Sequence, residues 1–412
     1  VRLAAPTKAR ATLNKSQCLN GGDDRHRAQA KEWQEKHHKE FPIDVFQTGS
    51  GTSSNMNANE VIANIATMYA KVEISPNDDV NMSQSSNDVI PTAIKLSAYM
   101  DLTKKLFPAL DGLIKSINDK ADSLKGTIKT GRTHLMDAMP IDFSEELKAW
   151  SSQLESSKEM LNVIEKKFLE LSQGGTAVGS GINAHKQFAK LFAQEITKLT
   201  KNKYKFTPAK NFYHELSAQD CSVQLSGELK NLAVILMKIS NDLRWMNSGP
   251  LAGISEIELK ALQPGSSIMP GKVNPVIPEA VAMASADVIG NDVSITVAAQ
   301  SGNFQLNVML PVIAYNLLKS INLLSGSMNA LSKNAIKTFK VNHKNLETSL
   351  SKNPILVTAL NPLVGYEKAA SIAKKAYKEN RPIIDVAAEE TDLAKSELIK
   401  LLNPSKLAKG GL

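Results

Sequence analysis

Apolar side chains recur at heptad spacing along three long stretches of the chain. The first lies between Pro140 and Pro208, the second spans residues 209–249, and the third follows Pro311. Heptad positions a and d lie on one side of an α-helix, so each stretch predicts a long helix packed against neighbours. The seams, in which Ser157 is the polar member, consist of Leu147, Trp150, Leu154, Ser157, Leu161, Ile164, Phe168 and Leu171; of Leu229, Leu232, Leu236, Ile239, Leu243 and Met246; and of Leu317, Ile321, Leu324, Met328 and Leu331.

Helices of about 25–40 residues are about 40–60 Å long at 1.5 Å per residue, and several in one chain predict an all-α fold built on a bundle. Shorter helices are expected near the C-terminal end, over Tyr366–Lys378, over Ile384–Glu390 and from Thr391 to Leu402. Long helices with apolar faces need other helices to cover them, so we expect oligomerisation through the bundle. Residues 1–40 lack this periodicity and predict an arm with one polar helix near Asp24–His38.

Four short polar segments interrupt the helical pattern. Residues 265–275, called the Ser266 loop from here on, read Gly-Ser-Ser-Ile-Met-Pro-Gly-Lys-Val-Asn-Pro. Proline lacks a backbone N–H and glycine admits unusual φ angles, so this segment cannot lie inside a helix. It is predicted to be a loop held between stiff helices, which is where function is often found.

The other three polar segments are Gln47–Asn55, Ser83–Asp88 and Lys129–His134. The first two precede helical patterns, and the backbone N–H groups at a helix N-terminus suit an anion. Ordinary capping by Ser or Thr is the alternative interpretation of both. A single histidine is more often structural than catalytic, so His134 by itself does not identify a site.

Composition and charge narrow the class of protein. The 412 residues are 42% hydrophobic and 22% charged, as in globular proteins. The formal charge is +8, but the lysines are scattered singly, so we expect a solvated surface, compatible with small anions, and no nucleic-acid partner. The sequence has no run of 18 apolar residues, which predicts no membrane partner. Cys18 and Cys221 have no metal-ligand spacing, and they indicate a reducing compartment.

Taken together, the polar segments resemble the fumarase/aspartase superfamily. The Ser266 loop resembles its signature, and Ser50-Gly51-Thr52, Ser85-Ser86-Asn87-Asp88 and Gly131-Arg132-Thr133-His134 follow the superfamily's order. The resemblance implies a helical fold of three domains. These are an apparently truncated N-terminal domain at 1–83, of which 1–38 match poorly, a central five-helix bundle at 84–344 and a small C-terminal domain at 345–412.

Within the superfamily, class II fumarate hydratases are the most similar, through Gly174–Gly179, Ser301–Val308 and Val357–Asn361. The resemblance implies reversible hydration of fumarate to (S)-malate in the citric acid cycle, by a homotetramer whose active sites are each shared between three subunits. It also implies a cytoplasmic enzyme, or one of the mitochondrial matrix if the source is eukaryotic. Val276–Glu279 resembles aspartate ammonia-lyases as well, which leaves that activity as an alternative. A catalytically inactive helical scaffold is a third interpretation.

The resemblance assigns roles to individual residues. Ser266 is the base that removes a proton from carbon, giving an aci-carboxylate intermediate, and His134 paired with Glu279 handles the water. This chemistry requires no metal ion or cofactor, and we expect neither. The implied substrate-binding residues are Ser50, Gly51, Thr52, Ser85, Ser86, Asn87, Thr133, Ser267, Lys272 and Asn274.

Fumarases commonly carry a second, peripheral anion site at a His-Pro-Asn-Asp sequence. The corresponding residues in this chain are Ser75, Pro76, Asn77 and Asp78, and the preceding segment Thr67–Ile74 is shorter than in familiar relatives. These four residues are therefore candidates for a secondary dicarboxylate site in which serine replaces the histidine.

Overall fold

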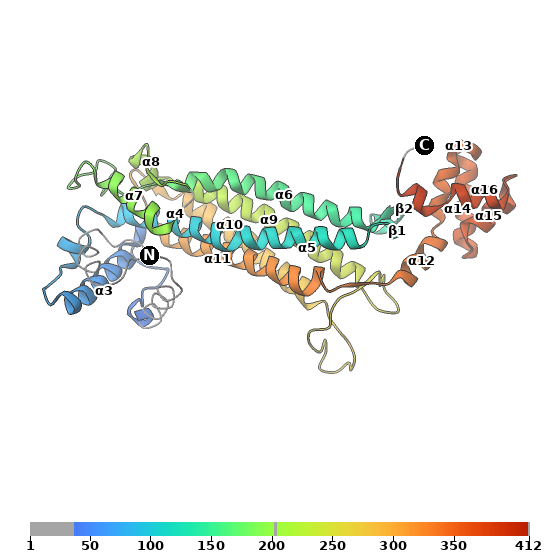
Figure 1. The fold of residues 1–412 in the computed structure, drawn as a ribbon, viewed down its shortest axis with the longest axis horizontal. Coiled ribbons are helices and arrows are strands. Elements are labelled where there is room, and N and C mark those ends of the chain that lie inside the picture. The colour runs from blue at the N-terminus through green and yellow to red at the C-terminus, as the bar shows by residue number, and fades with distance from the viewer. Residues whose placement is uncertain (1–36, 202–203, 411–412) are drawn as a thin grey trace. The chain divides into compact units, whose positions relative to one another are not determined.

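The computed structural model of the chain describes residues 37–201 and 204–410. This part is mainly helical, and its strands form only short two-stranded pairs (Figure 1). The predicted all-α fold is confirmed. The polar helix expected near Asp24–His38 falls largely outside the described residues.

The chain divides into two compact units, and several long helices contribute a segment to each. The first unit contains the described residues up to Pro108, together with Lys158–Ala233 and Ala286–Leu324. The second contains Ala109–Ser157, Val234–Ser285 and Ser325–Leu412. The division into three domains, with boundaries after residues 83 and 344, stays a prediction.

The predicted seams lie where the long helices form. Every seam residue, Ser157 included, is at most 7% exposed, so the heptad prediction is confirmed. The first seam continues beyond its helix into a short 3-10 turn and a strand. The elements of the long helices are α4 (Ser86–Asp101), η4 (Leu102–Leu106), α5 (Phe107–Ser123), α6 (Phe143–Glu165), η5 (Lys166–Leu169), α9 (Asp220–Met246), α10 (Val276–Ala299), α11 (Leu310–Leu331) and η6 (Ser332–Ile336).

In the first unit, buried polar side chains form hydrogen bonds and an ion pair between neighbouring helices. The buried carboxylate of Asp292 on α10 accepts a hydrogen bond from Ser226 on α9 at 2.7 Å and pairs with Lys230 at 2.7 Å. Asn291 donates to Ser320 on α11 at 3.2 Å. The remaining elements of this unit are η1 (His38–Glu40), η2 (Gly49–Gly51), α3 (Thr52–Ala70), η3 (Pro76–Val80), β3 (Glu170–Leu171), α7 (Phe188–Thr200), β4 (Thr207–Pro208), α8 (Phe212–Ser217), β6 (Gly302–Asn303) and β7 (Leu306–Asn307).

In the second unit, the polar segment Lys129–His134, which its composition predicts to be a loop, is mostly strand. β1 (Ile128–Thr133) pairs antiparallel with β2 (Met136–Asp142), and the pairing of Thr133 with Met136 leaves a two-residue turn. The loop prediction was wrong there because Ile128, Met139 and Ile141 are too widely spaced among polar residues to reveal a strand. A second pair joins β5 (Ile257–Glu258) to β8 (Lys340–Val341).

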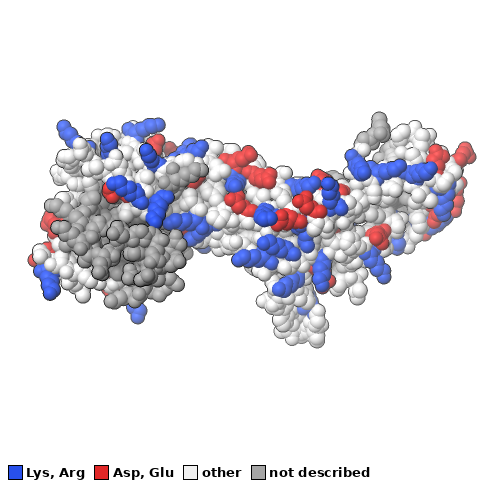
Figure 2. Space-filling view, in the orientation of Figure 1, with Lys and Arg blue, Asp and Glu red and all other residues white. Residues whose placement is uncertain are grey.

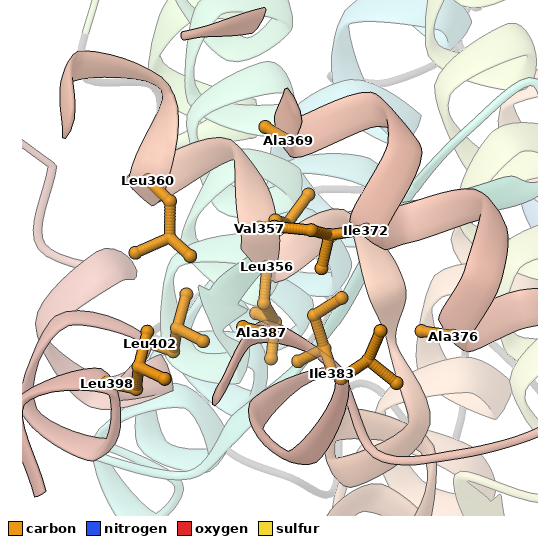
Figure 3. Packing of buried hydrophobic residues seen from close by; sticks show 11 residues of the cluster. Leu356, Val357, Leu360, Ala369, Ile372, Ala376, Ile383, Ala387, Leu398 and Leu402 are labelled. Atoms are coloured by element: carbon orange, nitrogen blue, oxygen red, sulfur yellow. The ribbon is translucent and has the colours of Figure 1, made fainter. Parts of the chain in front are cut away.

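The C-terminal helices build a hydrophobic cluster of their own (Figure 3). Leu360, Ile372, Val386 and Leu398 are fully buried in it. The expected helices are present within two residues of their predicted limits, except that the last begins at Lys395 with Ala394 as its N-cap. The elements here are α12 (His343–Lys352), η7 (Pro354–Leu360), α13 (Asn361–Val364), α14 (Tyr366–Glu379), α15 (Ile383–Glu390), α16 (Lys395–Leu401) and α17 (Pro404–Leu407).

Among the described helices, α10 alone is long and apolar enough to cross a membrane by length and composition. It nevertheless carries Glu279, Asp287 and Asp292, and two of these pair with lysines, Asp287 with Lys319 and Asp292 with Lys230. Asp292 is buried against α9, and a buried acid held by a neighbouring helix is a feature of a bundle helix.

Basic and acidic side chains are both spread over the face of the molecule drawn in Figure 2. Several form pairs one helical turn apart, as Lys115 does with Asp119 and Lys238 with Asp242. Such pairs stabilise exposed helices by a few tenths of a kcal/mol, about 0.2–0.5 each. The pattern is that of a solvated surface.

Candidate active site

The hydroxyl of Ser266 is held inside its own loop by two backbone donors. Its Oγ accepts hydrogen bonds from the N–H of Ile268 at 3.2 Å and of Met269 at 3.0 Å. Two N–H dipoles aimed at one oxygen favour negative charge on that oxygen. The local geometry therefore suits a serine that must act as a base.

The base of the Ser266 loop is closed by a tight turn of backbone. Gly265 N–H donates to the carbonyl of Lys272 at 2.8 Å, and the side-chain amide of Asn274 donates to the Gly265 carbonyl at 2.9 Å. A Cβ on Gly265 would lie 2.6 Å from the Lys272 oxygen, so only glycine fits. Ser267 and Lys272 are exposed, and no described acidic residue forms an ion pair with Lys272.

His134 stands at the tip of the β1–β2 hairpin. His134 and Leu135 are the two residues of the turn, and both have positive φ, 54° and 62°. A two-residue hairpin turn with positive φ at both positions is usually built from Asn and Gly, so His-Leu holds strain here. Thr133 and His134 are exposed, which leaves the ring accessible at a rigidly paired tip.

Glu279 lies in the first turn of α10, directly after the Ser266 loop, and its N–H donates to the Pro275 carbonyl at 3.1 Å. Among the described residues of this single chain, no hydrogen bond or ion pair joins Glu279 to His134. Their predicted pairing is therefore not formed within one chain.

In the first unit, Ser50 and Gly51 form a strained entry to helix α3. Ser50 has φ 60° and is 2% exposed, and its N–H donates to the carbonyl of Val308 at 3.1 Å. Its hydroxyl lies 3.2 Å from that of Thr52. A Cβ on Gly51 would approach Ile90 of α4 to 3.1 Å, so this entry abuts the first turns of α4.

Ser85 caps helix α4 and places the other predicted residues. Its Oγ accepts from the N–H of Asn87 at 3.2 Å, and its own N–H donates to Asp88 at 2.9 Å, a capping box. The side chain of Asn87 donates to the Ala177 carbonyl at 2.8 Å. The structure thus brings Ser50–Thr52 and Ser85–Asn87 to neighbouring helix starts in this unit.

The secondary-site candidates Ser75–Asp78 form the start of a short π-helical turn, η3. The Ser75 N–H donates to the Asp79 carboxylate at 2.9 Å, and its hydroxyl lies 3.2 Å from the Asp78 carboxylate. Asp78 N–H donates in turn to the Ser75 hydroxyl. Because two carboxylates already occupy these donors, the geometry disfavours an anion there.

Comparison with known proteins follows from these features. The sequence matches a family model described as "Lyase" over residues 2–290 and one described as "Fumarase C C-terminus" over residues 356–409. Fumarate hydratase class II 2 of Pseudomonas aeruginosa is 57% identical over 92% of this chain and 82% of that protein. Fumarate hydratase class II of Bacillus subtilis is 46% identical over 91% of this chain and 82% of that protein. The chain belongs to the class II fumarate hydratase family.

The fold agrees with that membership. The crystal structure of a recombinant class II fumarase from Schistosoma mansoni is similar, with a TM-score of 0.88 at 34% sequence identity. The match covers 97% of this chain and 88% of that one. The resemblance predicted from the polar loops is therefore confirmed at the level of the family.

Sequence reasoning missed a buried polar network between α3 and the start of α4. Asn55 of α3 donates to the Ser86 hydroxyl at 3.1 Å and to the Asn81 side chain at 3.2 Å. Asn59, one turn later, donates to the same Asn81 oxygen at 3.1 Å. Asn55 and Asn59 are 2% exposed. The signal was present, since two asparagines four residues apart on a helical face need partners when buried.

Asp88 was quoted as part of a motif but given no role, and it is fully buried. Its carboxylate accepts from the N–H groups of Gly174 and Thr176, both at 2.9 Å, besides that of Ser85. Burial raises the pKa of Asp88 to about 6, while these backbone bonds oppose the shift. Asp88 therefore ties the start of α4 to the 173–177 turn and so fixes the contact between Asn87 and Ala177.

Residues 37–201 and 204–410 contain no group of three or more His, Cys, Asp or Glu side chains placed to hold a metal ion.

Proposed function

We propose that this chain catalyses the reversible hydration of fumarate to (S)-malate, as a hydro-lyase of the citric acid cycle. The observation that carries the proposal is Ser266, whose oxygen accepts two backbone N–H bonds on a loop that also presents Lys272 and Asn274. Relatives named fumarate hydratase, up to 57% identical over most of the chain, support it.

The difficult step is removal of a proton from the malate carbon beside a carboxylate. That proton is weakly acidic, and the electron pair it leaves moves into the carboxylate, giving an aci-carboxylate. Ser266 takes the proton as an alkoxide, which the N–H groups of Ile268 and Met269 stabilise. Elimination of the hydroxyl group as water then gives fumarate, and hydration runs through the same steps in reverse.

The substrate is a dianion, and the chain offers one cation and several neutral donors for it. Lys272 supplies positive charge next to the developing aci-carboxylate, with Ser267 and Asn274 as donors beside it. The other carboxylate is held by hydroxyl and amide groups at the starts of α3 and α4. These are Ser50, Gly51, Thr52, Ser85, Ser86 and Asn87, with Thr133 beside the water.

His134 orients the water and relays its proton, and Glu279 pairs with the ring. Because these two described residues form no hydrogen bond or ion pair within one chain, the pairing belongs to an assembly in which a hairpin of one copy meets α10 of another. The exposed apolar tip of the hairpin supports this, since Leu135 is 55% and Met136 is 67% exposed.

The assembly we propose is a homotetramer formed through the bundle, with each active site shared between three subunits. Helix α10 supports it, because apolar side chains remain on the side that its own chain leaves uncovered. Val281, Val288 and Ile295 are at most 2% exposed, whereas Met283 and Val293 are 68% and 60% exposed. Apolar side chains exposed together on one helix face normally mark a contact with another protein.

The cycle to which this reaction belongs places the enzyme in the cytoplasm of a bacterium or in the mitochondrial matrix of a eukaryote.

Purified protein is tested with malate and with aspartate separately, following the ultraviolet absorbance of fumarate. Fumarate from malate supports the proposal. Fumarate from aspartate alone identifies an ammonia-lyase, and fumarate from neither, by a folded tetramer, identifies a scaffold.

A further inference from the structure

One buried carboxylate in the second unit lies against two cations. Glu256 is 1% exposed, and its Oε2 forms an ion pair with Lys129 Nζ at 2.6 Å, without the alignment of a hydrogen bond. Its Oε1 forms an ion pair with the guanidinium of Arg132. Lys129, itself 3% exposed, also pairs with Glu146 at 2.8 Å. Both oxygens of Glu256 are therefore engaged by cations from one strand.

That strand is β1, and it ends at the hairpin tip that carries His134. Lys129 and Arg132 lie on it three residues apart, and Arg132 is two residues before His134. The backbone of β1 cannot shift along its length without breaking both ion pairs. Glu256 thereby fixes the base of the hairpin.

Glu256 also belongs to the segment that leads into the Ser266 loop. Its N–H donates to the Met246 carbonyl at 2.8 Å, and its carbonyl accepts from Asn342 at 2.9 Å. Leu259 N–H donates to the Asn247 side chain at 2.8 Å. From Lys260 to Val273, the described hydrogen bonds lie within the loop itself, and the carbonyls of Asn274 and Pro275 then accept from Val276 and Glu279 at the start of α10. The Ser266 loop therefore starts from an anchor that Glu256 helps to hold.

We infer that Glu256, with Lys129 and Arg132, is a positioning cluster that holds the bases of two catalytic elements, the His134 hairpin and the Ser266 loop. This inference rests on the proposed function for its activity readout. A buried ion pair adds little net stability compared with apolar packing, but two cations on one carboxylate fix direction and distance. The hairpin and the loop therefore each leave the cluster in a fixed direction, whether the active site that they enter belongs to the same copy or to another.

The test compares two isosteric substitutions of buried carboxylates. Glu256→Gln removes the charge that joins the two elements. Glu215→Gln is the matched control. Glu215 is also buried and forms an ion pair with a lysine, Lys95, but it lies on α8, away from β1 and the Ser266 loop in the sequence. We expect Glu256→Gln to lower kcat about 10–100-fold with KM changed less than about threefold, since small misplacements of catalytic groups act on that scale. The control should stay within about threefold of wild type in both.

A second variant protects the test against a folding failure. Arg132→Gln removes a cation whose side chain is 19% exposed, and it should lower kcat in the same direction. If the two residues act as one unit, the double variant Arg132→Gln/Glu256→Gln loses no more kcat than the worse single variant. The inference would be overturned if the loss of kcat in the double variant equalled the product of the two single losses. It would also be overturned if the single variants lost no more kcat than Glu215→Gln.

Hydrogen–deuterium exchange separates this inference from the proposed function. Amides of residues 128–133 and 259–275 should exchange several-fold faster in Glu256→Gln than in wild type or Glu215→Gln. Wild-type protein that makes no fumarate from malate would defeat the proposed function, and the exchange result would still decide on the cluster. Unchanged exchange in both segments would defeat the cluster even if the enzyme is fully active.

Discussion

The backbone N–H of Met269 donates a hydrogen bond to the hydroxyl oxygen of Ser266 at 3.0 Å. A neutral serine is a poor base, and this donor, with that of Ile268, is placed to stabilise its alkoxide. Replacing Ser266 with alanine should lower kcat by about 10²–10⁴-fold, the range of a positioned base. The oligomeric state should be unchanged, because the side chain bonds only within its own exposed loop.

Steady-state kinetics and size-exclusion chromatography measure both outcomes. Ser267→Ala is the control from the neighbouring position, where loss of a substrate donor should raise KM more than it lowers kcat. Near-normal turnover by Ser266→Ala would remove this residue as the base.

Gly265 gives a prediction about the shape of the loop. An alanine Cβ would lie 2.6 Å from the Lys272 carbonyl oxygen, so the turn that brings Lys272 back to Gly265 must open. We expect Gly265→Ala to lower kcat/KM about 10–100-fold, because Lys272 and Asn274 move with the turn. The melting temperature should change little, since the loop is exposed.

Gly112→Ala on α5 is the matched control, because no atom lies within 4 Å of its added Cβ. It should be neutral or stabilising by up to about 1 kcal/mol. Equal loss of activity in both variants would contradict the steric argument.

The bundle could be predicted from sequence because helix period and burial are local properties. The seam from Leu147 to Leu171 is visible as spacing alone, and its members are buried in the structure. The hairpin of His134 could not be predicted in this way. Its turn uses His and Leu at positive φ, where the sequence rules expect Asn or Gly.

The candidate site shows the same limit. Ser266, Lys272 and Asn274 lie within one short loop, so a motif reveals them together. Glu256 and Arg132 meet across 124 positions of sequence, and no pattern links them before the chain is folded. Asn55 and Asn81 likewise meet only when α3 lies beside the loop before α4.

Asp88 gives a prediction about pH. Burial raises its pKa from 3.8 to about 6, so the folded state binds this proton more tightly than the unfolded state does. The resulting stability is fully present below about pH 4 and is lost as the pH rises through about 6. The free energy of unfolding of wild type minus that of Asp88→Asn should therefore fall by up to about 3 kcal/mol between about pH 4 and 7.

Urea unfolding at steps of pH measures that difference, and the variant serves as the reference for all other titrating groups. A difference that is flat or rises with pH would contradict a raised pKa for Asp88.

The hairpin turn allows the chemistry of His134 to be separated from its strain. Asparagine tolerates positive φ, so His134→Asn should keep the turn at φ near 54° while removing the ring that exchanges a proton. We expect kcat to fall about 100-fold or more, with circular dichroism and melting temperature unchanged. A variant that keeps near-normal kcat would exclude His134 as the group that relays the proton.

The exposed side of α10 gives the test of assembly. Val293 is 60% exposed in the single chain, so Val293→Asp removes almost no packing from it. If four copies bury this side against one another, the new carboxylates are forced into an apolar contact without partners. In the proposed tetramer each site takes loops from several copies, so we expect smaller species by sedimentation and a loss of activity in proportion to the loss of tetramer. Tyr377→Asp on α14, where the tyrosine is 81% exposed, is the matched control and should leave both assembly and activity unchanged. A Val293→Asp protein that remains tetrameric and active would show that this side of α10 is not buried between copies of this chain.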